Sequence, residues 1–292
     1  MNILDELKQN KIRLSDGAWG TFLQDKGLKP GECPELWNIT HRGDVLNIAE
    51  SYLLAGSDII ETNSFGGSVF KLSQYGLGDR VSEINQAAAE ISREAAGNEK
   101  HVAGSIGPTG KMTLMGDVTE NELYDAFCEQ AVALEKGGAD IIIIETMSAL
   151  DEASIAIRAA RESTKCTVII TMTFTKTPKG EYRTMMGVSP EEMVYSMKEA
   201  GAHIIGSNCG NGIEDMIGIV KAIKAADNKI PIMIQANAGV PELIDGKTVF
   251  RESPEMMASF VPELIKAGAN IIGGCCGTTP EHISQIARTL GR

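Results

Sequence analysis

The sequence has few aromatic residues and an excess of negative charge. Seven Phe, five Tyr and two Trp make up 5% of the 292 residues, whereas Gly occurs 31 times, a composition that suits many short turns. Lys and Arg number 27 against 39 Asp and Glu, for a formal charge of −12. Because an acidic chain without a basic tract repels phosphate backbones, we do not expect nucleic acid as a partner.

Long uninterrupted apolar runs are also missing. No window reaches the length of a membrane span, and the first residues, "MNILDELKQNKIRL", predict a short amphipathic helix without the apolar core of a signal peptide. We therefore expect no membrane partner and a cytoplasmic location. In that reducing compartment the six cysteines do not imply disulfides, so metal binding, catalysis and core packing are the interpretations to compare.

Four segments share one pattern, in which a helical stretch is followed by Gly and then by a β-branched run. These segments are "AGSDII", "GGADIIII", "AGAHII" and "AGANII", beginning at Ala55, Gly137, Ala200 and Ala267. The Gly suits the left-handed residue that ends a helix, and the run suits a buried strand. Four more apolar runs alternate with them and begin at Ile12, His101, Thr167 and Ile230. The chain therefore predicts eight buried strands.

Helical segments separate these strands. We expect them near 44–55, 80–96, 121–136, 151–161, 190–200, 212–226, 254–267 and 280–290. Capping boxes at "TENE" and "SPEE" mark two of the helix starts. Eight strands alternating with eight helices predict an α/β fold of the (β/α)8 TIM-type barrel class, as a single domain over 1–292; a doubly wound open sheet is the alternative.

Three of the six cysteines follow predicted strands, at the end where barrel enzymes carry their sites. Cys209 follows the sixth strand and Cys275 and Cys276 the eighth, with Asn237 at the end of the seventh between them. Three sulfur ligands with an open fourth position are typical of a catalytic Zn²⁺ site, and the alternative is a chance coincidence of strand-end thiols. The other cysteines are expected in the core or in loops: Cys33, Cys128 and Cys166.

Acidic residues also stand at strand ends. Asp16, Glu61 and Glu145 follow the first, second and fourth predicted strands. A carboxylate is costly to bury without a partner, so these residues either hold a ligand ammonium group or tie neighbouring loops together by hydrogen bonds. No GxGxxG or Walker spacing occurs, so nucleotide binding has no support.

Six motifs, in this order, carry a resemblance to a known family: "DGAWGTFLQ", "AGSDIIETNSFGG", "VAGSIGPTG", "NCG", "ANAG" and "GGCCGTTPEHI". From about Ile12 to Leu290 the sequence resembles the homocysteine S-methyltransferase family. The resemblance is closest to the homocysteine-binding module of cobalamin-dependent methionine synthase, and betaine–homocysteine methyltransferase is a more distant relative.

The resemblance implies a zinc-bearing (β/α)8 barrel and gives roles to particular residues. It implies zinc ligands at Cys209, Cys275, Cys276 and, when substrate is absent, Asn237. It implies substrate-binding residues at Asp16 and Glu145, which would hold the homocysteine amino group, and at Glu61 and Thr62, which would line the same pocket.

The resemblance further implies an enzyme that binds homocysteine as a zinc thiolate and methylates it to methionine. The chain carries no DxHxxG motif of a corrin-binding domain and no second barrel, so the expected donor is a methyl-corrinoid on a separate protein or domain. Betaine or S-methylmethionine is an alternative donor. Two further hypotheses are a corrinoid-system methyltransferase that acts on a different thiol or methylated substrate, and a zinc-storing barrel without catalysis.

Overall fold

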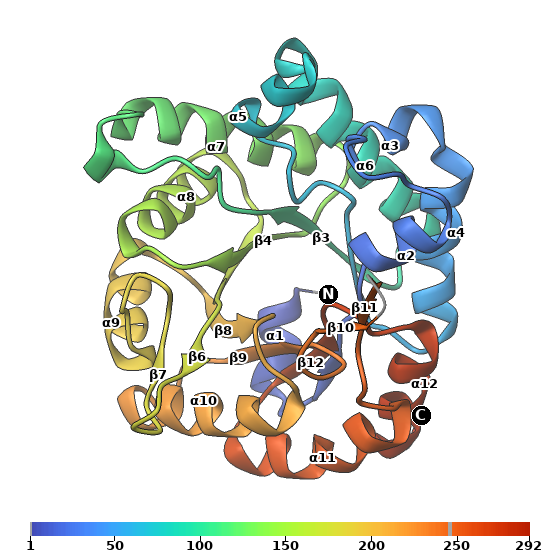
Figure 1. Cartoon of the computed structure of the whole chain (residues 1–292), viewed down its shortest axis with the longest axis vertical. Coiled ribbons are helices and arrows are strands. Elements are labelled where there is room, and N and C mark those ends of the chain that lie inside the picture. The colour runs from blue at the N-terminus through green and yellow to red at the C-terminus, as the bar shows by residue number, and fades with distance from the viewer. Residues whose placement is uncertain (1, 245–246) are drawn as a thin grey trace.

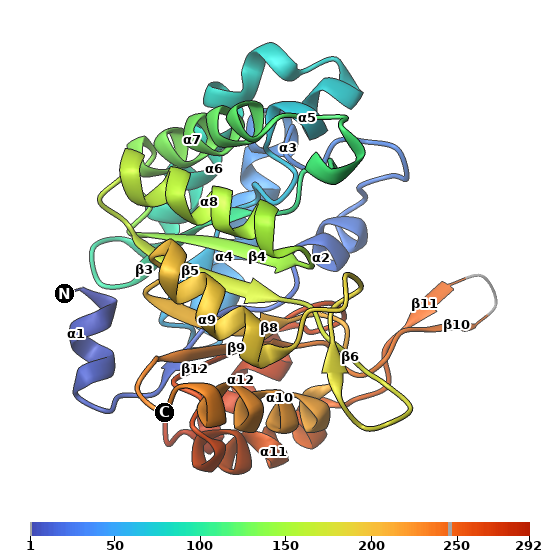
Figure 2. The same ribbon diagram turned by 90° about the vertical axis from the view of Figure 1, so that its left-hand side faces the viewer.

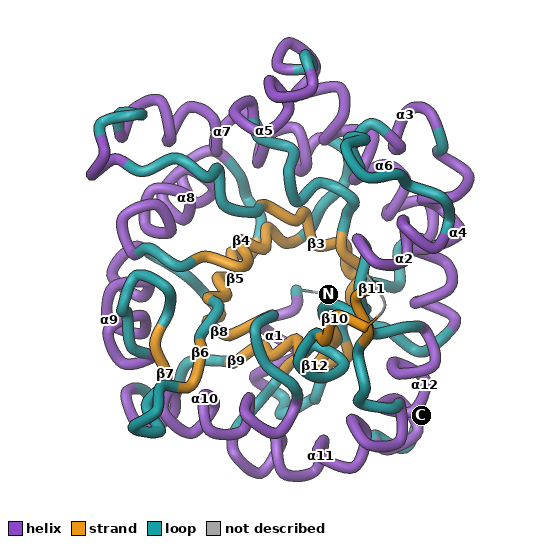
Figure 3. Tube along the Cα trace, in the orientation of Figure 1, coloured by secondary structure: helices purple, strands orange, loops and turns teal. Residues whose placement is uncertain are grey.

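The computed structural model describes residues 2–244 and 247–292, and a ring of eight parallel strands lies at its centre (Figures 1 and 3). The strands, in the order in which they neighbour one another, are β1 (Arg13–Leu14), β12 (Ile271–Gly274), β9 (Ile232–Ala236), β8 (Ile204–Asn208), β5 (Thr167–Met172), β4 (Ile141–Met147), β3 (His101–Ile106) and β2 (Ile59–Glu61). The prediction of a (β/α)8 barrel is confirmed, and the open doubly wound sheet is wrong.

The ring closes between β1 and β2, the first and last strands of the sheet order. The backbone N–H of Asp58 donates to the Leu14 carbonyl at 2.7 Å, and the Leu14 N–H donates to the Asp58 carboxylate at 3.0 Å. These two bonds take the place of a longer ladder, so the barrel is complete although β1 has two residues.

Eight helices alternate with the strands and cover the outside of the ring (Figure 1). They are α4 (Arg42–Leu54), α6 (Val81–Ala96), α7 (Glu120–Lys136), α8 (Leu150–Ser163), α9 (Pro190–Ala200), α10 (Ile213–Ala226), α11 (Pro254–Ala267) and α12 (Pro280–Thr289). Both predicted capping boxes form, at the starts of α7 and α9. Gly201 and Gly268 end α9 and α11 with φ of 101° and 118°, as the sequence pattern predicts. No helix in the described part of the chain is both long and apolar enough to cross a membrane.

The N-terminal helix α1 (Ile3–Lys8) closes the end of the barrel where the strands begin. Its Ile3 and Leu7 pack with the inward-facing Ile59, Ile141 and Ile271 in one buried cluster. Burying these apolar side chains stabilises the fold and leaves the opposite end of the barrel for the polar strand ends.

Two hairpins and several short helices were not predicted. The antiparallel pairs β6 (Thr175–Lys176) with β7 (Tyr182–Arg183), and β10 (Glu242–Ile244) with β11 (Lys247–Val249), project from the end opposite α1 (Figure 2). The short helices are α2 (Gly20–Asp25), α3 (Trp37–Thr40) and α5 (Val69–Leu72). All of them lie in βα loops, so the loops at the carboxyl ends of the strands are longer and more structured than those at the other end.

Candidate metal and substrate site

The three strand-end thiols form one cluster. The Sγ atoms of Cys209, Cys275 and Cys276 all lie within 4.8 Å of one another, and those of Cys209 and Cys276 are 3.9 Å apart. Cys209 comes from the end of β8, and the other two follow β12, two strands along the ring. The topology of the barrel thus brings together the residues that the sequence placed at this rim.

One of the three thiols stands on an uncommon backbone conformation. Cys209 has a φ of 58°, in the left-handed region that non-glycine residues seldom adopt. Its N–H donates to the Gln235 carbonyl at 3.1 Å, and the Cys275 N–H donates to the Ala236 carbonyl at 2.7 Å. Both bonds go to β9, the strand between the two cysteine-bearing strands, which therefore holds them in register. Backbone strain that the surrounding structure enforces is common at functional sites.

The thiols share their protons unequally. Hydrogen bonds from Cys275 and then Cys276 lower the pKa of Cys209 to about 3. The bond to Cys209 is also the largest cause that raises the pKa of Cys275 well above its usual value and that of Cys276 to about 11. The Cys209 thiol is thus the first of the three to ionise, with Cys275 and Cys276 hydrogen-bonded to its sulfur. A cation in their midst would allow the other two to ionise as well.

The cluster has the dimensions of a zinc site. Tetrahedral Zn–S bonds of about 2.3 Å place two sulfur ligands about 3.8 Å apart. The observed separation of 3.9 Å between Cys209 and Cys276 is close to that distance. Three sulfur ligands are also the soft donor set that favours Zn²⁺ over Mg²⁺ or Ca²⁺. The residues present therefore fit the ion that the resemblance implies.

Asn237 is the candidate for a neutral fourth ligand. It follows β9, its side chain is 2% exposed, and its amide hydrogen bond contributes to lowering the pKa of Cys209. The Oδ1 atom of Asn237 is buried without a hydrogen-bond partner among the described residues. An unpaired buried amide oxygen is costly, and a metal ligand bond would satisfy it.

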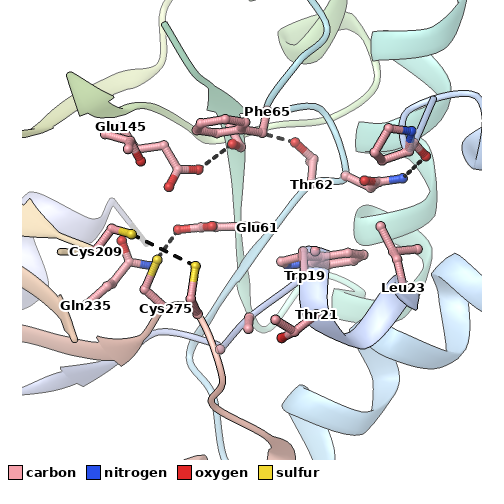
Figure 4. A pocket seen from close by; sticks show the side chains of 18 of the residues that line it. Trp19, Thr21, Leu23, Glu61, Thr62, Phe65, Glu145, Cys209, Gln235 and Cys275 are labelled. Atoms are coloured by element: carbon pink, nitrogen blue, oxygen red, sulfur yellow. Dashed lines mark hydrogen bonds between the residues drawn. The ribbon is translucent and has the colours of Figure 1, made fainter. Parts of the chain in front are cut away.

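A cavity of about 300 Å³ opens beside the thiols (Figure 4). Trp19 and Leu23 lie across it from Cys209 and Cys275, with Glu61 between the two sides and Phe65 above Glu61. The other polar residues along its wall include Glu35, Thr62, Asn63, Ser64, Ser105, Glu145, Thr146 and Gln235. None of the described residues that line this cavity is a Lys, Arg or His.

Glu145 reaches the cavity from an irregularity in β4. The pairing of β4 with β5 shifts between Ile144 and Met147, and Thr146 has a φ of 62°. Such a bulge redirects a side chain out of the regular alternation. Ser105 donates to Oε1 of Glu145 at 2.5 Å and Asn208 donates to Oε2 at 3.0 Å, so both carboxylate oxygens are fixed.

Glu61 and Asp16 are held at different depths. Gln235 donates to Oε1 of Glu61 at 2.6 Å, and Glu61 lines the cavity. Asp16 is fully buried and is not among the lining residues. Its carboxylate accepts from the Glu61 N–H at 2.8 Å and from the Trp19 indole at 2.9 Å. Asp16 thus supports two residues of the wall from behind, and its predicted contact with a substrate amino group stays a prediction.

The three acids are protonated more readily than usual. Burial raises the pKa of Asp16 to about 6. Burial also raises the pKa of Glu61 well above its usual value, with the charges of Glu145 and Asp16 adding to the effect. The pKa of Glu145 rises to about 7, mainly through burial and against the hydrogen bond from Ser105. A positive ligand group in the cavity would lower the pKa values of the two acids that line it, Glu61 and Glu145.

Thr62 lines the cavity as predicted, but its hydroxyl is already engaged. Its Oγ1 lies 2.5 Å from the Ser64 Oγ and accepts from the Ser105 N–H at 3.0 Å. Ser105, Asn208 and Gln235, each of which holds an acid in place, were not predicted from the sequence. Only their position on or next to the ends of strands could have indicated them.

The comparisons with known proteins agree with this geometry. A family model described as homocysteine S-methyltransferase matches residues 13–290. The methionine synthases of Mycobacterium leprae (strain TN) and Mycobacterium tuberculosis (strain ATCC 25618 / H37Rv) are 30% and 31% identical to the chain over 309 and 307 residues. These matches cover 100% and 99% of the chain and 25% of each relative, so the chain spans about a quarter of the length of those proteins.

Among solved structures, the homocysteine methyltransferase MmuM from Escherichia coli matches over nearly the whole chain. Its metallated form gives a TM-score of 0.79 at 20% identity and covers 97% of both chains. Its oxidized form gives 0.79 at 22% identity and covers 99% of both chains. At such low identity these matches support the fold.

Proposed function

The chain belongs to the homocysteine S-methyltransferase family, and on that premise we propose that it binds homocysteine as a zinc thiolate and methylates it to methionine. One observation carries the proposal: three thiols within 4.8 Å of one another adjoin a cavity whose charged side chains are all acidic. Such a site suits a ligand with a sulfur at one end and an ammonium group at the other.

We propose that Cys209, Cys275 and Cys276 hold the zinc ion and that Asn237 is the ligand that substrate replaces. A neutral amide oxygen is the weakest ligand of the four and is therefore the one to leave. When bound, the ion would lower the pKa of an incoming thiol and so provide a nucleophile at neutral pH. The chain's own part is to fix the direction in which the sulfur is presented.

The ammonium group of homocysteine is assigned to Glu145, with Glu61 beside it. Both carboxylates line the cavity and have neutral hydrogen-bond donors, so a positive group would be their first charged partner. Asp16 is the third acid that the sequence predicts to bind substrate, and Thr62 is predicted to line the same pocket. In this proposal Asp16 acts mainly through Trp19 and Glu61, which it holds by hydrogen bonds.

The apolar side chains of the cavity provide a surface for the carbon chain of the substrate. Trp19, Leu23 and Phe65 would pack against the two methylenes of homocysteine, and burial of that surface adds affinity. Gly107 leaves room for Phe65 in its present position, because a Cβ there would come within 2.6 Å of the Phe65 ring. A dry, oriented thiolate is the form that attacks a methyl group in line.

For the methyl donor we propose a methyl-corrinoid on a separate protein or domain. The resemblance to cobalamin-dependent methionine synthase and the identity of 30–31% with mycobacterial methionine synthases support this donor. The 292 residues would then act as one homocysteine-binding domain that meets a donor from outside. Six free cysteines are consistent with a cytoplasmic location, which is part of the proposal.

Zinc-edge X-ray absorption of the purified protein, with and without L-homocysteine, tests the acceptor. We expect a change from three sulfurs and one light atom to four sulfurs when homocysteine binds. A shell of three sulfurs that does not change would overturn homocysteine as the zinc-bound acceptor, and a protein that binds no zinc would overturn the metal site.

The donor is tested by supplying methylcobalamin, betaine or S-methylmethionine with L-homocysteine and measuring methionine by chromatography. The proposal expects methionine with methylcobalamin. Methionine formed only with betaine or S-methylmethionine would identify a small-molecule donor instead. Methyl transfer to a different thiol would indicate a corrinoid-system methyltransferase with another acceptor.

A further inference from the structure

Two strained residues stand at the site, on different strands. Thr146 and Cys209 have φ of 62° and 58°, and the one other non-glycine residue with positive φ in the described chain, Asn10, lies far from the cavity near the N-terminus. A β-branched residue such as Thr146 is especially costly in this region. The surrounding structure must therefore hold both residues in place.

One side chain joins them. Asn208, the residue before Cys209, is fully buried, and its Oδ1 accepts from the Thr146 N–H at 2.9 Å and from the Thr171 hydroxyl at 2.9 Å. Its Nδ2 donates to the Thr146 hydroxyl at 2.8 Å and to Oε2 of Glu145 at 3.0 Å. All four hydrogen bonds of an amide are made, so the orientation of the group is fixed.

These bonds span three neighbouring strands. Asn208 ends β8, Thr171 lies on β5, and Glu145 and Thr146 lie at the bulge of β4. Asp could not replace Asn208 in this arrangement with its charge intact, because a carboxylate has no hydrogen to donate to Glu145. The contact thus requires one group that both accepts and donates.

We propose that Asn208 is a positioning residue that sets the distance between the sulfur end and the ammonium end of the substrate, and so selects homocysteine over shorter thiol amino acids. The proposal rests on the proposed function above. Cys209 is one of the proposed metal ligands and Glu145 the proposed ammonium ligand. Asn208 is covalently attached to the first and hydrogen-bonded to the second. A substrate that must reach both is selected by length.

L-Cysteine is the matched probe, because it keeps the thiol, ammonium and carboxylate of L-homocysteine and lacks one methylene. Calorimetry on the zinc-loaded protein measures the dissociation constant of each thiol, and the ratio of the two constants measures selection by length. A single methylene is worth about 10- to 200-fold in a well-fitted site. We expect a ratio in that range for the unchanged chain.

Asn208→Ala removes all four hydrogen bonds, and Asn208→Leu removes them while filling a similar space. We expect both variants to retain zinc. The selectivity for homocysteine over cysteine, measured by the ratio of the two dissociation constants, should fall by about tenfold, because the site then discriminates less between thiols that differ by one methylene. If the Ala variant does not fold, the Leu variant carries the test. Asn270→Ala is the control, because Asn270 pairs with the Ile232 N–H at the opposite end of the barrel; its ratio should not change.

An equal loss of affinity for both thiols in the Asn208 variants, at an unchanged ratio, would overturn the proposal and leave Asn208 a structural role. An unchanged affinity for both thiols would overturn it as well. A wild-type protein that binds zinc but neither thiol would instead overturn the proposed function, so the two failures are distinguishable.

Discussion

The two ends of the barrel both bury carboxyl groups, but the end where the strands begin also supplies their positive partners. Glu6 and Asp58 are 8% and 9% exposed there. Arg13 lies 2.7 Å from Glu6 and 3.6 Å from Asp58, and Asp58 also contacts Lys100 at 3.3 Å and Arg292. Although burial works in the opposite direction, the hydrogen bonds from Leu14 and Arg292 hold the pKa of Asp58 below its usual value.

At the other end the acids have neutral partners. Asp16, Glu61 and Glu145 accept from hydroxyl, indole, amide and backbone N–H groups, and no salt bridge within the described part of the chain includes them. The pKa of each is raised, by burial first of all. A buried carboxylate without a cationic partner in the protein is costly. Such groups are found where a bound ligand supplies the positive charge. The two ends thus differ in how they treat buried acids: one end pairs them with cations, and the other end leaves them with neutral hydrogen-bond donors only, which is the basis of the substrate assignment proposed above.

The largest expected effect is at the thiols. Cys275→Ala should lower zinc affinity by more than about 100-fold, because loss of an outer-shell partner alone already costs about 10- to 100-fold. Metal content after dialysis against a chelator measures it. Cys166→Ala is the control and should bind zinc as before, because Cys166 lies just before β5, at the end of the barrel that α1 covers. Full zinc retention in Cys275→Ala would remove this cysteine from the site.

Asp58→Asn should have the next largest effect, and it should act on stability. Removing the charge of this buried carboxylate takes a partner from Arg13, Lys100 and Arg292, which should lower the free energy of unfolding by about 3 kcal/mol. Urea unfolding measures the loss. Asp5→Asn is the control, because the ion pair between Asp5 and Lys8 is exposed. An equal effect in the two variants would argue against the paired role of Asp58.

Glu145→Gln should leave stability and zinc content nearly unchanged and weaken homocysteine binding. The Gln amide can accept from Asn208 and donate to the Ser105 hydroxyl, so both contacts survive. Loss of one charge from a buried ammonium pair costs at least about 2 kcal/mol, or about 30-fold in Kd. Calorimetric titration checks this. Unchanged affinity would remove Glu145 from the ammonium site.

Asp16→Asn should alter how stability depends on pH. Burial raises the pKa of Asp16 to about 6, from an unfolded value of about 4, so the folded chain binds this proton more tightly. Its contribution to stability is complete below about pH 4 and is lost as the pH rises to about 6, by about 1.4 kcal/mol for each unit between the two pKa values. Unfolding of chelator-treated wild type and variant from about pH 4 to 7 compares them. Parallel curves would contradict the raised pKa.

Arg292→Ala should have the smallest effect. The Arg292 side chain is 30% exposed and bonds to Asp58 and, at 2.6 Å, to the Ile12 carbonyl. Because Arg13 and Lys100 remain beside Asp58, the loss should stay below about 1 kcal/mol and shrink at high salt. Thermal unfolding at two salt concentrations measures it. A loss as large as that of Asp58→Asn would make Arg292 the main partner of Asp58.

Local patterns were enough to predict the barrel and the grouping of the thiols. A Gly followed by a β-branched run marks each of four strands, and the order of strands then fixes which residues share a rim. The bulge at Thr146 was not predictable in this way, because it depends on an amide from Asn208, 62 residues further along the chain. The same holds for Asp16, whose place behind the wall is decided by contacts with Trp19 and Glu61. Side-chain contacts between strands leave no periodic signal.

The two-residue strand β1 has a consequence for how the chain folds during synthesis. Its Arg13 and Leu14 pair with Ile271 and Ile272, so the first strand of the barrel must wait for the last. Contacts so distant in sequence slow folding, and an unpaired strand edge invites association with other chains in the meantime. A short edge with a charged residue presents little to pair with. Because β1 is so short, it offers other chains few backbone groups to pair with before β12 has been synthesised.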